Sequence, residues 1–360
     1  MGSEMELYIA GGCGEHGRNC FWFAEGEDAY LVDCGRMAGV EFADSLPRLN
    51  KEQIENLRGV FLTHSHADHS AALPWLFQQG YKGPVIATAP TFAQLPFACE
   101  NALCLEELCK LGKGIFRDVS IMWGLSGHCA GSVWLQFDWH GKTILFSGDY
   151  TEQSEVYPCD KIRGKKADLA VLDCAYGTWT PEKGDGREEA ALTVRELLDK
   201  TPLVFLPVPK YGRGLDLLCL LHRLLAGQTY YGDEHFCRQV QSAAREEKWY
   251  RCESIKPLRQ VQPDADEKEG IIFLSDPQLR GETGRRAMEL LDLGAAGMMT
   301  GTVDKGSLSE RLIDSGAMRM CKYPVHLNDA MCRELIGQNR FQKVIRYHSP
   351  EYAYGRRIEV

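Results

Sequence analysis

The chain has 360 residues, of which 44% are hydrophobic and 25% are charged, values that are ordinary for a globular protein. Its formal net charge of −9 excludes a general electrostatic attraction to nucleic acid, so a polyanion would have to be held by a local basic groove or by a bound metal. The most apolar run, Leu215 to Ala226, is too short to span a bilayer and contains Asp216, His222 and Arg223, so no membrane segment is predicted.

The length is large for one compact core and predicts two domains. The 14 cysteines show no Cys-x-x-Cys spacing, and no signal peptide opens the chain. The cysteines are therefore expected to be buried or free thiols in a reducing compartment, and the predicted location is the cytoplasm. The sequence leaves open whether the chain forms homo-oligomers.

The first predicted elements are strands. A strand over Glu6 to Ala10 runs into a glycine-rich turn over Gly11 to Gly17, and a hairpin follows over Cys20 to Ala24 and Ala29 to Asp33. A predicted helix over Lys51 to Leu57 leads into the next strand. After it come another short strand, Val85 to Thr88, and a segment expected to be rich in helix as far as about Leu111.

Between these elements, four side chains that can bind a metal lie where a strand meets a helix. The strand Val60-Phe61-Leu62 is followed by His64, His66, Asp68 and His69. In an extended turn, residues two apart project the same way, so His64 and His66 can hold one ion while Asp68 and His69 face a neighbouring one. Imidazole and carboxylate ligands favour zinc, with manganese or iron as alternatives. The competing interpretation is a histidine-rich surface turn, but this order of ligands after a strand is specific.

Two later strand ends supply further candidate ligands. His128 follows the apolar segment Val119 to Trp123, and Asp149 follows the strand that begins at Lys142. A single Gly-His or Gly-Asp is most often only a turn. The arrival of both after the histidine-rich loop, in this order, makes His128 and Asp149 metal-ligand candidates.

With these residues the chain resembles the metallo-β-lactamase superfamily, whose fold places two facing β-sheets between outer helices. The resemblance implies that Asp33 supports the metal loop without binding metal. It also implies a set of metal ligands that matches the family one by one: His64, His66, Asp68, His69, His128 and Asp149.

The rest of the chain resembles the β-CASP nucleases, the branch of that superfamily that includes ribonuclease J and the endonuclease of messenger RNA 3′-end processing. By this match Asp173, His326 and His348 are its motifs A, B and C. The match departs from the branch around motif B, where Asn328 stands in place of an acid, and after motif C, where Ser349 and Pro350 follow the histidine. These departures bear on substrate preference and leave the ligand assignments unchanged.

The resemblance implies an α/β protein with two domains. Residues 1–180 and 320–360 are expected to form the metallo-β-lactamase αββα sandwich, and residues 181–319 an inserted α/β β-CASP cap. The helix expected over Leu215 to Leu225 is apolar nearly all round, which predicts burial against the sheet of the cap.

The resemblance also assigns roles. Two zinc ions are expected, one held by His64, His66 and His128 and the other by Asp68, His69 and His348, with Asp149 between them. A hydroxide shared by the ions would attack the phosphodiester, Asp68 would orient it, and His326 with Asp173 would protonate the leaving oxygen. The candidates for binding the nucleic-acid backbone are basic residues of the cap, for which the competing interpretation is a solvated surface charge: Lys210, Arg213, Arg280 and Lys305.

The leading hypothesis is therefore a zinc-dependent ribonuclease acting on single-stranded RNA. Three alternatives remain open: a DNA-directed nuclease, a hydrolase of a small thioester or lactone, and a scaffold with inactive metal loops. His348 argues against the DNA-directed enzyme, because DNA-acting members of the branch tend to carry valine at motif C. The complete ligand set argues against the inactive scaffold. The sequence does not distinguish cleavage from an end from internal cleavage.

Overall fold

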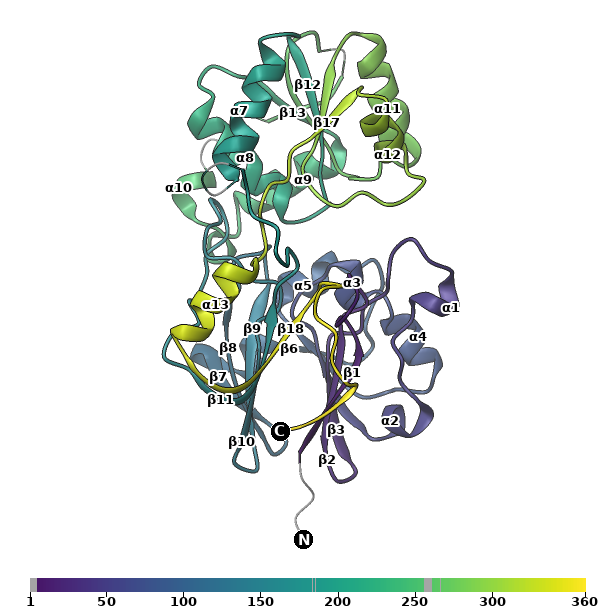
Figure 1. Ribbon diagram of the computed structural model, residues 1–360, viewed down its shortest axis with the longest axis vertical. Coiled ribbons are helices and arrows are strands. Elements are labelled where there is room, and N and C mark those ends of the chain that lie inside the picture. Colours follow the sequence, from purple (N-terminus) through teal and green to yellow (C-terminus); the bar gives the residue numbers. More distant parts are fainter. Residues whose placement is uncertain (1–4, 183, 185, 256–260, 266) are drawn as a thin grey trace. The chain divides into compact units, whose positions relative to one another are not determined.

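The computed structural model describes residues 5–182, 184, 186–255, 261–265 and 267–360. The chain divides into two compact units (Figure 1). Unit 1 comprises Met1–Glu152, Cys159–Trp179 and His326–Val360, and unit 2 comprises Gln153–Pro158 and Thr180–Val325. Among the described residues, no helix has the length and apolar character needed to cross a membrane.

Unit 1 contains two sheets. The first has the strand order β19-β1-β2-β3-β4-β5-β6. Its strands are β1 (Glu6–Gly11), β2 (Cys20–Glu25), β3 (Asp28–Val32), β4 (Leu57–Phe61), β5 (Val85–Ala87), β6 (Ala102–Cys104) and β19 (Arg357–Glu359). The second has the order β18-β11-β10-β9-β8-β7. Its strands are β7 (Lys113–Phe116), β8 (Val119–Leu125), β9 (Val133–Trp139), β10 (Lys142–Phe146), β11 (Lys166–Asp173) and β18 (Arg340–Tyr347).

The core of unit 1 lies between the two sheets. Side chains of both sheets form one buried cluster, in which Phe23 and Phe61 of the first sheet contact Phe137 of the second. The strands alternate between this cluster and a second cluster on the outer face of their own sheet, as expected where both faces of a sheet are covered.

Helices cover both outer faces of unit 1. Leu73 and Leu76 of α4 pack on the first sheet, and Leu335 of α13 packs on the second. The predicted αββα sandwich is therefore confirmed (Figure 1). The helices of this unit are α1 (Phe42–Ser45), α2 (Lys51–Glu55), α3 (Ala67–Ser70), α4 (Leu73–Gln78), α5 (Ala89–Gln94), α6 (Leu105–Leu108), η1 (Lys110–Gly112) and α13 (Asp329–Gly337).

Two local details differ from the expectation. The helix expected over Lys51 to Leu57 ends at Glu55, because Leu57 already belongs to β4. The segment expected to be rich in helix up to about Leu111 contains α5, α6 and η1, but also the edge strand β6, which pairs with β5. This strand is three residues long and largely exposed, so it leaves no alternating hydrophobic pattern in the sequence.

Unit 2 is a parallel α/β domain, which confirms the predicted α/β character of the cap. Its sheet has the order β14-β13-β15-β12-β16-β17, and all of its strand pairs are parallel. The strands are β12 (Leu203–Pro207), β13 (Tyr230–Gly232), β14 (Gln262–Pro263), β15 (Gly270–Leu274), β16 (Ala296–Met299) and β17 (Met318–Met320). The helices are α7 (Arg187–Leu198), α8 (Arg213–Leu224), α9 (Glu234–Ala243), η2 (Glu247–Trp249), α10 (Cys252–Ile255), α11 (Gly281–Asp292) and α12 (Leu308–Asp314).

Within unit 2, the buried carboxylate of Asp216 on α8 connects three distant segments. One of its oxygens accepts a hydrogen bond from Ser154 Oγ at 2.7 Å. The other accepts bonds from Arg187 Nη2 and Tyr323 OH, both at 2.9 Å. All four residues are buried, so Asp216 compensates the guanidinium charge and ties the crossing segment 153–158 to both ends of the unit.

Candidate metal centre

The histidine-rich loop lies between β4 and α3, as the sequence predicts. The imidazole of His69, in α3, is held by Asp33, which follows β3: His69 Nδ1 lies 2.7 Å from Asp33 Oδ2. The same carboxylate accepts bonds from the backbone N–H and the hydroxyl of Thr63, each at 2.8 Å. Asp33 therefore orients both the loop and the ring, and leaves His69 Nε2 facing the interior of the site.

The six predicted ligands of the resemblance, together with His348, converge at the ends of strands that are distant in the sequence. Asp149, which follows β10, lies at the centre: its Oδ2 is 3.5 Å from Nε2 of both His64 and His128, and its Oδ1 is 3.1 Å from His69 Nε2. His66 Nδ1 lies 3.1 Å from His128 Nε2. One group of potential ligand atoms within 4.8 Å of one another consists of His64, His66, His128 and Asp149.

A second group forms on the other side of Asp149. His348, which follows β18, has Nε2 at 2.9 Å from Asp68 Oδ2 and Nδ1 at 3.2 Å from Asp149 Oδ1. Asp68, His69 and His348 have potential ligand atoms within 4.8 Å of one another. The structure thus brings together all seven predicted metal ligands, in the two groups that the sequence suggests.

The charges of this cluster fit divalent cations. Burial and the neighbouring His69 keep the pKa of His64 well below its ordinary value, so His64 stays neutral and retains a lone pair for a metal. Burial disfavours protonation of His348, but Asp149 and Asp68 raise its pKa to about 10. Burial alone would raise the pKa of Asp149, yet His69 and the other histidines hold it well below its usual range. The carboxylates thus attract positive charge into the cluster.

Unpartnered buried atoms point to the same ligand class. His64 Nε2 is buried without a hydrogen-bond partner, and the two buried ring nitrogens of His348 lie beside carboxylates without forming a hydrogen bond of good geometry. Buried polar atoms are costly when unsatisfied, and imidazole nitrogens beside carboxylates are the donor set that suits zinc and related divalent metals. The residues present therefore fit a divalent metal centre.

The predicted motif A and motif B residues lie beside this cluster. Asp173, at the end of β11, is fully buried, and its Oδ2 lies 3.1 Å from His326 Nδ1. The same carboxylate accepts bonds from the backbone N–H groups of Tyr150 and Ala175, each at 3.0 Å. His326 Nδ1 also lies 3.7 Å from Asp149 Oδ2. Asp173, His326, Asp149 and His348 form a third group of potential ligand atoms, so the geometry allows His326 either a proton-transfer or a ligand role.

The four basic residues predicted to bind nucleic acid lie in unit 2. Arg280 is engaged by acids of its own unit, with its Nη2 at 2.6 Å from Asp304 Oδ2. Lys210 and Lys305 are exposed, and Arg213 is half-buried at the beginning of α8.

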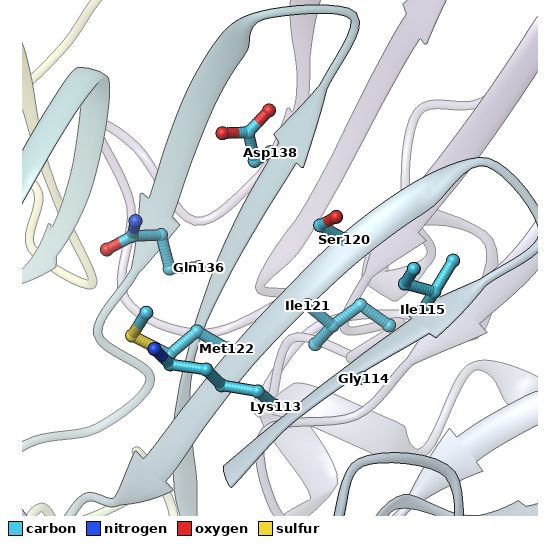
Figure 2. A pocket seen from close by; sticks show the side chains of 8 residues that line it. All are labelled: Lys113, Gly114, Ile115, Ser120, Ile121, Met122, Gln136 and Asp138. Carbon is cyan, nitrogen blue, oxygen red and sulfur yellow. The ribbon is translucent and has the colours of Figure 1, made fainter.

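A surface hollow of about 420 Å³ lies on the outer face of the second sheet of unit 1 (Figure 2). Side chains of β7, β8 and β9 line it, among them Lys113, Met122 and Asp138. None of the sequence-predicted site residues lines this hollow, so it is separate from the histidine cluster.

Sequence reasoning missed three residues that surround the ligands. His16 stacks on His348 with ring centroids 4.6 Å apart, and its Nδ1 lies 2.8 Å from the carbonyl oxygen of His348. Asn19 Nδ2 lies 2.8 Å from His69 Nε2. Gly35 allows α3 to approach, because a Cβ there would lie 1.7 Å from the Asp68 carbonyl oxygen. The only available signal was the glycine-rich segment 11–17, which was interpreted as a tight turn.

Comparison with known proteins agrees with this geometry. Residues 13–98, which contain the histidine-rich loop, match the model of the "Metallo-beta-lactamase superfamily". This segment of the chain is therefore similar to that superfamily. A solved structure, described as a protein of unknown function from Enterococcus faecalis V583, has a similar fold, with a TM-score of 0.64. It is 12% identical in sequence and covers 99% of this chain and 100% of its own.

Three curated relatives are similar over a longer part of the chain. Ribonuclease TTHA0252 of Thermus thermophilus is 30% identical over 56% of this chain and 52% of its own length. Transcription termination factor FttA of Methanothermobacter thermautotrophicus is 27% identical over 61% and 40%. Cleavage and polyadenylation specificity factor 73 of Drosophila melanogaster is 24% identical over 60% and 35%. The chain therefore spans about half or less of the length of these relatives.

Proposed function

We propose that the chain is a metal-dependent hydrolase that cleaves phosphodiester bonds of single-stranded RNA. The observation that carries this proposal is the convergence of six imidazole and carboxylate side chains around Asp149, next to the His326–Asp173 pair. The relatives named as a ribonuclease and as a cleavage factor support RNA as the substrate.

Two zinc ions are the proposed cofactor, with manganese or iron as substitutes. His64, His66 and His128 would hold the first ion, Asp68, His69 and His348 the second, and Asp149 would contact both. When bound, such ions lower the pKa of water and stabilise negative charge on a phosphate oxygen. Asp33 fixes the ring of His69 through Nδ1, and Asp68, which is partly exposed, would orient the attacking water.

His326 is the proposed proton donor to the departing ribose oxygen. A ribose alkoxide is a poor leaving group, so a positioned acid lowers the barrier to its departure. The contact between His326 Nδ1 and Asp173 Oδ2 fixes one side of the ring and leaves Nε2 to carry the transferred proton. Asp173 itself is held by two backbone N–H groups and would act as a positioning residue.

The proposed arrangement has unit 1 as the catalytic domain and unit 2 as the substrate-binding cap. Its boundaries differ from the expected 1–180, 181–319 and 320–360, because unit 2 comprises Gln153–Pro158 and Thr180–Val325. Lys210, Arg213 and Lys305 are the proposed contacts to the RNA backbone. Arg280 is a weaker candidate, because a contact to phosphate would compete with its ion pair to Asp304.

The decisive experiment compares purified, metal-analysed protein on labelled single-stranded RNA, single-stranded DNA and a chromogenic ester. The proposal expects RNA to be cleaved fastest, and expects Asp149→Ala to abolish that cleavage together with most of the metal. Faster hydrolysis of DNA or of the ester would support one of the alternative substrates. Full RNA cleavage in protein that contains no transition metal would refute the mechanism.

A further inference from the structure

The parallel sheet of unit 2 places three loops at one edge. The segments after β12, β15 and β16 all leave the carboxyl ends of neighbouring strands, since β15, β12 and β16 are adjacent and parallel. β12 lies between β15 and β16 in the sheet. After β12 the chain continues to β13 on one side of it, and after β15 it continues to β16 on the other side. In open parallel sheets, ligands bind at the carboxyl ends of strands next to such a change of direction.

Arg213 lies at this edge of the sheet, and its positive charge is not neutralised by a carboxylate of the described residues. It is the first residue of α8, a helix of 12 residues without a side-chain cap. Its guanidinium lies against the loop after β16, because a Cβ placed on Gly301 would be 1.7 Å from Arg213 Nη1. Arg213 Nε is buried without a hydrogen-bond partner. Among the residues that the structure describes, Arg213 has no carboxylate within ion-pair distance.

A second cation, Lys322, lies near the same strand end and belongs to the last segment of unit 2. The backbone N–H groups of Cys321 and Tyr323 donate to the carbonyl oxygens of Met299 and Thr300, both at 2.9 Å, so Lys322 lies alongside the end of β16. Burial and the charge of Arg213 together lower the pKa of Lys322. Two cations thus influence each other in a partly desolvated place, where a bound anion would reduce their repulsion.

A third observation also indicates a ligand. Thr300 is fully buried at the end of β16, and its hydroxyl has no hydrogen-bond partner. The nearby acids are already engaged by other groups. Asp216, one turn along α8, is occupied by Arg187 and Tyr323, and Asp304 by Arg280. A buried hydroxyl and a buried guanidinium N–H without partners, beside a second cation, are the donor set that phosphate oxygens accept from.

We propose that Arg213, Lys322 and Thr300 form a phosphate-binding site at the carboxyl edge of the unit 2 sheet. Arg213 would donate from its guanidinium, Lys322 from its ammonium group and Thr300 from its hydroxyl. Gly301 has no side chain and leaves the guanidinium room to lie at the strand end. This proposal rests on the proposed function. The site would hold a phosphate of the RNA other than the one being cleaved.

The test uses the metal-loaded 360-residue protein and four single variants. Arg213→Gln and Lys322→Gln remove a cation of the site. Arg285→Gln is the matched control, because Arg285 is exposed on α11 with only Glu282 as an ion-pair partner within 4 Å among the described residues. Binding of inorganic phosphate is followed by calorimetry, and binding of a short phosphorothioate RNA by fluorescence anisotropy at several salt concentrations. Any phosphate affinity of the metal centre is common to all variants and cancels in the comparison.

Each site variant should weaken phosphate and RNA binding about 10- to 100-fold, the usual effect of losing one charge-assisted hydrogen bond. Each should also reduce the slope of log affinity against log salt by about 0.7, the value for one phosphate contact on a single strand. Arg213→Lys should recover part of the affinity, because it keeps the charge but loses the guanidinium geometry. Equal losses in the Arg285→Gln control, or unchanged binding in both site variants, would refute the site.

Two further comparisons are needed. One distinguishes a terminal phosphate from a backbone phosphate, and the other distinguishes failure of the phosphate site from failure of the proposed function. RNAs of one sequence with a 5′-phosphate or a 5′-hydroxyl are compared: a selective loss with the phosphorylated RNA assigns the site to a chain end, and an equal loss assigns it to the backbone. If the site variants lose phosphate binding while the wild-type protein cleaves no RNA, the site stands and the proposed function falls. If the wild-type protein cleaves RNA and the site variants bind and cleave it normally, the phosphate site is refuted and the proposed function remains.

Discussion

Replacing His326 by alanine distinguishes a proton donor from a metal ligand. In the proposed role, the variant keeps both metals and cleaves RNA about 10²–10⁴-fold more slowly, the span expected for loss of a positioned general acid. The defect should depend on the leaving group. An analogue whose leaving oxygen is replaced by sulfur, or one that releases an acidic phenol, needs no proton and should be hydrolysed almost as fast by the variant as by the wild type.

The geometry around Asp173 sharpens this prediction. Its two carboxylate oxygens accept bonds from the N–H groups of Tyr150 and Ala175, and one of them also contacts His326. In Asp173→Asn, whichever way the amide points, its NH₂ group faces a backbone N–H. Leaving these buried donors unsatisfied costs about 1–3 kcal/mol. The variant should therefore show a milder form of the same leaving-group dependence and a lower melting temperature.

The assay is single-turnover cleavage of the paired substrates, with metal content measured on the same samples. A His326→Ala protein that cleaves both substrates at the wild-type rate would make His326 a structural residue. One that is equally slow on both, with metals retained, would indicate phosphate binding in place of proton transfer. Loss of one metal equivalent would assign His326 to the metal group that it forms with Asp149 and His348.

Four further outcomes are expected. Asp149→Ala should lose most of the metal by elemental analysis, because one carboxylate serves both ligand groups; retention of two equivalents would contradict its central role. His348→Ala should lower the occupancy of one ion with an unchanged circular dichroism spectrum, whereas unchanged metal content together with unchanged RNA cleavage would make the motif C match accidental. Asp216→Ala should lower the free energy of unfolding by about 3–5 kcal/mol in urea titrations, because it strands the buried charge of Arg187; a loss below 1 kcal/mol would argue against that pairing. Gly35→Ala should weaken metal binding by displacing Asp68, and unchanged affinity would contradict the close approach.

The metal centre could be anticipated from the sequence because its signals are local. His64, His66, Asp68 and His69 lie within one loop, and His128 and Asp149 each follow an apolar strand. Strands that run the same way in a sheet end at the same edge, so strand-end residues that are far apart in the chain converge. Hydrophobic pattern also predicted the buried helix α8. The αββα architecture and the ligand role of His348 were implied by the resemblance to the metallo-β-lactamase superfamily.

The sequence could not reveal partners that meet only through tertiary structure. Arg213 and Lys322 are separated by more than a hundred positions, and no sequence motif contains both residues. Asp216 was noticed only as a charge that argues against a membrane span, yet its partners Arg187 and Tyr323 lie 29 and 107 residues away. His16 sits in a turn recognised for its glycines, and its stacking on His348 depends on the two ends of the chain meeting.

Charge balance links the metal centre to the basic edge of unit 2. The carboxylates of Asp33, Asp68, Asp149 and Asp173 carry as much negative charge as two divalent ions carry positive charge, so the loaded centre would have little net attraction for a long polyanion. The whole chain, at −9, would repel one. Under the proposed function, affinity for RNA would then come from cations that no carboxylate neutralises. Arg280 is paired with Asp304, whereas Arg213 has no such partner among the described residues and faces Lys322, which makes that edge the place where backbone charge is best compensated.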